Sequence, residues 1–149
     1  MINIIILIAC TLCGFACGKY LEKRVKRKGE FYNDLTRYVL LLKINVACRK
    51  LEIGKFNDEF SEQCSPIFKD FLFDGKIKCS LNAIQKSNLT KFFDNLSCSS
   101  SEELGKHIDY YTVLINADAK QVTEGEVAKA SVFAKLGILF GMMVGIVLM

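Results

Sequence analysis

The last fourteen residues, LGILFGMMVGIVLM (136–149), carry no charge and contain three glycines at four-residue spacing. Gly137, Gly141 and Gly145 therefore fall on one face of a helix, since an α-helix has 3.6 residues per turn. An apolar helix with such a small-residue face is typical of a membrane span that packs closely against another helix. We therefore expect these glycines to be positions of membrane-helix packing.

This stretch by itself would form only about 21 Å of helix, which is short for a hydrocarbon core of about 30 Å. If the helix starts at Val132 and the Lys135 ammonium reaches up to the lipid headgroups, the span lengthens to roughly 27 Å. The predicted transmembrane helix therefore covers residues 132–149.

The opposite end of the chain has the same character. Residues 2–18 carry no formal charge. They would form about 25 Å of helix, near the lower limit for crossing a bilayer. Gly14 and Gly18 lie four residues apart, as the C-terminal glycines do. We predict a second transmembrane helix over residues 1–18, with both glycines on its packing face.

All charged residues lie between the two apolar ends. The 20 Lys and Arg and the 16 Asp and Glu all fall within residues 19–135. A basic juxtamembrane segment, residues 19–29, follows the first span, a position typical of lipid-headgroup anchors rather than of a nucleic-acid-binding arm. By the positive-inside rule we expect a cell-membrane protein with a cytoplasmic middle and both termini outside. The predicted headgroup anchors are Lys19, Lys23, Arg24, Lys26, Arg27 and Lys28 beside the first span, and Lys129 and Lys135 beside the second.

Two other interpretations rest on cysteines near the N-terminus. The run LIAC (7–10) looks like a bacterial lipobox, which would lipidate Cys10 and make the chain an exported lipoprotein binding module. However, no basic residue precedes the apolar stretch, as a secretory signal requires. Cys10, Cys13 and Cys17 share a helix face, and a C-x-x-C pair would suit a redox or metal-handling membrane protein. No second pair or histidine cluster completes such a site, so we predict neither a metal nor another cofactor.

Other chemistry-bearing residues are sparse. The only histidine, His107, is expected in a surface or capping role. The chain has no glycine-rich phosphate loop, no Ser/His/Asp order and no carboxylate pair in an apolar setting, so we predict that it is not an enzyme. Four further cysteines are expected at core or half-buried positions of a reducing compartment. They are Cys48, Cys64, Cys79 and Cys98.

The middle of the chain, residues 30–131, has the three- and four-residue apolar spacing of helices. We expect one long helix over residues 30–53 that can continue the first span, with Gly29 as a soft joint. The phenylalanines that follow at helical spacing are expected in the core. No alternating strand pattern occurs, so we predict an all-α fold, a small cytoplasmic helical bundle flanked by an N-terminal and a C-terminal transmembrane helix.

Several local signals divide this helical domain. Residues 54–58 indicate a turn, Pro66 a helix start or a kink, and residues 73–76 a break. One or two short helices are expected over residues 81–96.

The clearest helix start comes later in the chain. Ser100, followed three residues on by Glu103, forms the pattern of a capping box. The helix that it begins is expected to run to Val122, with Gly125 as the one weak point before the second span.

Three short motifs match one known family. The segment FAKLGILFG (133–141) is similar to a terminal aromatic-x-Lys/Ser-Leu-Gly-aliphatic-Leu-x-Gly signature, and LGKHID (104–109) to a helix with a Leu-Gly and a following Asp. The opening span ends in GKYL (18–21) and then turns basic. In these features the chain resembles the stage III sporulation protein AB family of endospore-forming bacteria. It departs from the family at 43–46 and 51–53, where KINV and LEI stand in place of Glu-x-Glu-Ile and Thr-Pro-Leu.

This resemblance implies a fold and a process. The soluble part is expected to be a helical bundle similar to the cytoplasmic domains of type II secretion F proteins. The protein is expected in the mother-cell membrane during sporulation, as a non-enzymatic subunit of a secretion-like channel complex between mother cell and forespore. The implied partners are the secretion-type ATPase of that complex, docked on the cytoplasmic domain, and its other membrane subunits.

Overall fold

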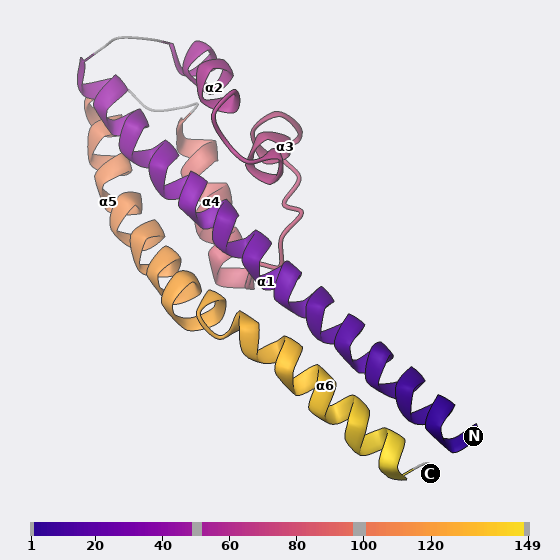
Figure 1. The fold of residues 1–149 in the computed structure, drawn as a ribbon. Coiled ribbons are helices and arrows are strands. Elements are labelled where there is room, and N and C mark those ends of the chain that lie inside the picture. Colours follow the sequence, from indigo (N-terminus) through magenta and orange to yellow (C-terminus); the bar gives the residue numbers. More distant parts are fainter. Residues whose placement is uncertain (1, 49–51, 97–100, 148–149) are drawn as a thin grey trace. The chain divides into compact units, whose positions relative to one another are not determined.

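The computed structural model describes residues 2–48, 52–96 and 101–147, which form helices and the segments that join them (Figure 1). The expected all-helical fold is confirmed, and no strand occurs in these ranges. The chain divides into two compact units, one of them Lys28–Val122 and the other built from both ends. The helices are α1 (Ile2–Cys48), α2 (Ile53–Ser61), α3 (Pro66–Asp74), α4 (Ala83–Leu96), α5 (Ser101–Lys120), the π-helical segment η1 (Gln121–Val127) and α6 (Ala130–Val147).

Helix α1 is continuous over 47 residues and joins the predicted first span to the long helix expected after it. At Gly29, where we expected a soft joint, the helix continues without a break. A glycine inside a helix costs only about 1 kcal/mol relative to alanine. Directly after it, Phe31 and Leu35 are buried on one helix face, and their burial offsets this cost.

The core of the Lys28–Val122 unit, called here the helical domain, is a cluster of aromatic rings around Tyr38. This side chain is fully buried, and the ring centroids of Phe56, Phe60 and Phe68 lie 5.4, 5.3 and 5.7 Å from its own. All three pairs are tilted or edge-to-face, the geometries that aromatic rings favour. The expectation that the phenylalanine stripe forms the core is confirmed.

The turn predicted at residues 54–58 is wrong, because α2 covers these positions. Phe56 and Phe60 are one helical turn apart and both are buried. The Tyr38 hydroxyl also donates a hydrogen bond of 2.7 Å to Asn57 Oδ1. Tertiary packing against α1 thus outweighs the turn propensity of the Gly54 and Asn57 positions.

The limits of α3 follow the sequence signals closely. Ser65 is the N-cap, and its hydroxyl accepts a hydrogen bond of 3.4 Å from the Phe68 N–H. Pro66 occupies the first turn, where its missing N–H costs nothing. Gly75 ends the helix with φ +64°, a left-handed conformation. The predicted helix start and the predicted break are both confirmed.

The second half of the helical domain contains α4 as one unbroken helix and α5 after it. Gly125 lies in η1, so the weak point predicted there coincides with a local change of helix type. Two of our expectations, Ser100 as N-cap and Cys98 in the core, fall outside the described residues.

Candidate functional site

The candidate site is the pair of helices formed by the N-terminal part of α1 and by α6. Among the described residues, one helical stretch, Glu103–Val147, contains a segment long and apolar enough to cross a membrane. This result agrees with membrane association of the C-terminal end. The N-terminal span at residues 1–18 and the orientation of the termini stay predictions.

The two helices meet on their glycines and run antiparallel. Gly14 contacts the backbone of Gly137 and Gly141, and Gly18 contacts that of Phe133 and Ala134. At the far end of the pair Gly145 lies against Leu7. All five sequence-predicted packing glycines therefore lie at one helix–helix contact.

The contact leaves little space for a side chain. A Cβ on Gly18 would lie 2.6 Å from the carbonyl oxygen of Phe133, and one on Gly141 would lie 2.6 Å from that of Cys10. Both neighbours are backbone atoms, so neither can rotate away. Gly145 differs, because the nearest atom to an added Cβ is the flexible end of Leu7, at 2.6 Å. The close approach of the two backbones thus depends most on the inner glycines.

The basic residues after the first span form a partly paired cluster. Glu22 is 7% exposed and forms ion pairs with Lys26 at 2.7 Å and Lys19 at 3.0 Å. Hydrogen bonds from these two ammonium groups lower the pKa of the Glu22 carboxyl. The remaining predicted anchors on these helices are exposed at the surface of the unit. They are Lys23, Arg24, Arg27, Lys129 and Lys135.

Lys28 departs from the anchor prediction. Its side chain is only 5% exposed and belongs to the helical domain. Burial raises the pKa of the Cys79 thiol to about 11 and also raises that of the Asp118 carboxyl, while the positive charge of Lys28 opposes both shifts. We therefore correct its assignment: a lysine buried beside these groups is part of domain packing and is not a lipid anchor.

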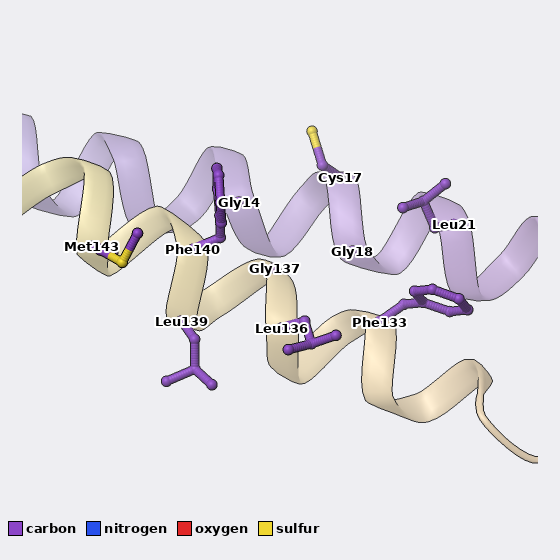
Figure 2. Close-up of a pocket in the computed structure, with 10 residues that line it drawn as sticks. All are labelled: Gly14, Cys17, Gly18, Leu21, Phe133, Leu136, Gly137, Leu139, Phe140 and Met143. Atoms are coloured by element: carbon purple, nitrogen blue, oxygen red, sulfur yellow. The ribbon is translucent and has the colours of Figure 1, made fainter.

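An apolar groove of about 530 Å³ lies along one side of the helix pair. Gly14 and Gly137 line it without side chains, and the large side chains that line it come from both helices (Figure 2). Leu21 and Phe133 lie toward one end of the lining and Met143 toward the other. Its surface is almost entirely apolar. We refer to this feature as the membrane groove.

The sequence pattern alone did not reveal the membrane groove. Its walls include Leu21, Phe133 and Phe140, which were noted only as apolar residues or as parts of a family motif. The available signal was the presence of large apolar residues beside each glycine at helical spacing. That signal does not say which side of each helix faces its partner, so the two walls could not be brought together.

The cysteines of the first helix do not form a ligand cluster with other residues. Cys13 and Cys17 are exposed and Cys10 is half-buried, and Cys17 lines the membrane groove. Within the part of the chain that the structure describes, no group of three or more His, Cys, Asp or Glu could hold a metal ion. No observation here favours the redox or metal-handling interpretation.

His107 has a packing role that we did not expect. Its ring stacks on Phe92, with centroids 6.0 Å apart and planes at 4°, and lies 4.6 Å from the Tyr111 ring. The side chain is half-buried and Nε2 lies 3.4 Å from the Phe92 carbonyl oxygen. The expected surface or capping role is therefore corrected to a contact between α4 and α5.

The fold and the glycine contact define an all-helical protein whose C-terminal helix can cross a membrane. The model of the stage III sporulation protein AB family matches residues 54–149, and the chain belongs to this family. The resemblance stated from the motifs is thereby confirmed, and the protein is sporulation-related. A search of curated proteins and a search of solved structures each returned no match.

Proposed function

We propose that the protein is a non-enzymatic membrane subunit of a secretion-like channel complex between mother cell and forespore. The observation that carries this proposal is the family match, which covers most of the helical domain together with the glycine-bearing α6. In this role both apolar helices lie in the mother-cell membrane, and the helical domain lies in the cytoplasm. The glycine contact supports it, because small residues allow close packing where the bilayer removes the hydrophobic drive for association.

The helical domain is proposed to dock the secretion-type ATPase of the complex. One face of the domain, around Lys43 on α1 and Asp109 on α5, supports this role. An ion pair of 2.7 Å between Lys43 and Asp109 joins α1 to α5, and both side chains are about half exposed. Large apolar side chains near this pair are also exposed. Leu40 (54%) and Val113 (69%) lie one turn away on α1 and α5, and Ile44 (48%) directly follows the lysine. Protein–protein contacts combine an apolar centre, where charged residues are rare, with a polar rim, and exposed apolar residues bordered by a charged pair fit this composition.

The proposed docking face is tested with matched variants of the full chain. Ile44→Asp places a charge on this face, whereas Ile84→Asp makes the same change at a more exposed isoleucine of α4, 75% exposed. We expect the first variant to lose co-purification with the candidate ATPase from sporulating-cell membranes and the second to retain it. Equal recovery of the ATPase with both variants would refute this face. Failure of the unaltered chain to recover any ATPase would refute the docking role itself.

A further inference from the structure

The membrane groove has the length of one bilayer leaflet. Its lining on α6 runs from Phe133 to Met143, about 15 Å of helix at 1.5 Å per residue. One leaflet of a hydrocarbon core of about 30 Å has the same depth. The volume of about 530 Å³ also falls within the range of about 300–1,000 Å³ typical of small-molecule sites.

Two cations lie in register with one end of the groove. Arg24 lies one turn beyond Leu21 on α1, and Lys129 lies in the turn just before α6, four residues before Phe133. Gly18 lies against Phe133 and Ala134 in an antiparallel pair, so residues after Gly18 and residues before Phe133 lie toward the same end of the pair. Both side chains are exposed. On α1 the nearby acid, Glu22, is already paired with Lys19 and Lys26. On the other side of the site, Glu124 and Glu126 lie in η1, shortly before Lys129.

We propose that the membrane groove binds one acyl chain of an anionic phospholipid, with the lipid phosphate held between Arg24 and Lys129. The apolar walls receive the chain, and the two cations complement the headgroup charge at the cytoplasmic end. The site requires that both helices lie in the bilayer, as in the proposed function. It adds a lipid of stated charge and a defined position to that role.

The headgroup arm of the test uses native mass spectrometry of the full chain from micelles that contain equal phosphatidylglycerol and phosphatidylcholine with identical acyl chains. We expect one retained phosphatidylglycerol. In the double variant Arg24→Gln with Lys129→Gln, the ratio of retained phosphatidylglycerol to phosphatidylcholine should fall about five-fold for each cation removed. Lys86→Gln with Lys91→Gln removes the same charge from exposed positions on α4, in the helical domain and away from every predicted anchor, and should keep the preference. Equal loss in both double variants would overturn the site, because it would show attraction to net charge alone.

The second part of the test fills the groove with a larger side chain to exclude the acyl chain. Cys17 lines it and is exposed, so Cys17→Phe should abolish retention of either phospholipid. Its neighbour Ala16 is exposed but does not line the groove, so Ala16→Phe should retain lipid as the unaltered chain does. A lipid-free dimer that Cys17→Phe converts to monomers would overturn the proposal in favour of a second copy in the groove. A chain that stays soluble without detergent would instead refute the membrane role in the proposed function.

Discussion

At the scale of single residues, burial changes the character of side chains that look ordinary in the sequence. Lys28 closes the basic run after the first span, yet its side chain is buried in the helical domain. Cys79, in the segment between α3 and α4, is half-buried within reach of its charge. From the sequence, Lys28 was expected at the lipid surface. Cys79 was expected in the domain, and nothing distinguished it from the other cysteines there.

The reactivity of Cys79 tests this environment. Burial raises the pKa of its thiol from 9.0 to about 11. Because only the thiolate is nucleophilic, alkylation at pH 8 should be about a hundred-fold slower than at an unburied thiol, and its rate should rise about ten-fold per pH unit until near pH 11. Peptide mass spectrometry after timed iodoacetamide treatment measures the rate, with the exposed Cys48 as internal reference. Equal rates at the two cysteines at pH 8 would contradict the buried thiol.

At the scale of helices, glycines in this chain serve different purposes. Gly75 has φ +64°, and nothing within 4 Å would contact an added Cβ. Gly105 lies inside α5 with equally open space around it. The first is required by backbone conformation and the second is not.

Substitution by alanine should therefore change the free energy of unfolding in opposite directions at these two positions. Gly75→Ala should lower the free energy of unfolding by about 1–2 kcal/mol, since an L-residue pays that cost in the left-handed conformation. Gly105→Ala should raise it by about 0.5–1 kcal/mol through higher helix propensity. Denaturant titration followed by circular dichroism in micelles measures both. Destabilisation by Gly105→Ala would show that this position has a packing constraint.

The glycines of the helix pair give a second matched comparison. Gly141→Ala should destabilise the pair by about 1–3 kcal/mol, because the new methyl group meets the rigid Cys10 backbone. Gly145→Ala should cost less, because the Leu7 side chain can change rotamer. Thermal unfolding of the two variants in micelles shows which of them is less stable. The reverse order would refute the backbone contact at Gly141.

At the scale of the whole molecule, the proposed topology places the entire helical domain on one side of the membrane. Cys48, at the end of α1, is exposed and reports on that side. An impermeant maleimide should leave it unlabelled in intact cells and should label it in inverted membrane vesicles. Labelling in intact cells would place the domain outside and favour the exported lipoprotein interpretation.

Local signals in the sequence predicted most of the fold. Ser65 and Pro66 do begin a helix and Gly75 does end one, because caps and left-handed positions depend on a few neighbouring residues. The turn predicted at residues 54–58 was wrong because the structure there depends on distant residues. Phe56 and Phe60 pack against Tyr38, which lies far away in the chain. The docking face and the groove walls were likewise beyond reach, as each combines residues from two helices.

The sequence by itself determined the helical class, the uncharged ends, the glycine spacing and the family, because periodicity, charge and short motifs are properties of neighbouring residues. Only the tertiary structure decided that Gly14 meets Gly137, that Lys28 is buried, and that large side chains border a groove. These features depend on the rotation and register of helices distant in sequence. Packing between side chains sets that rotation and register, and no local pattern encodes it.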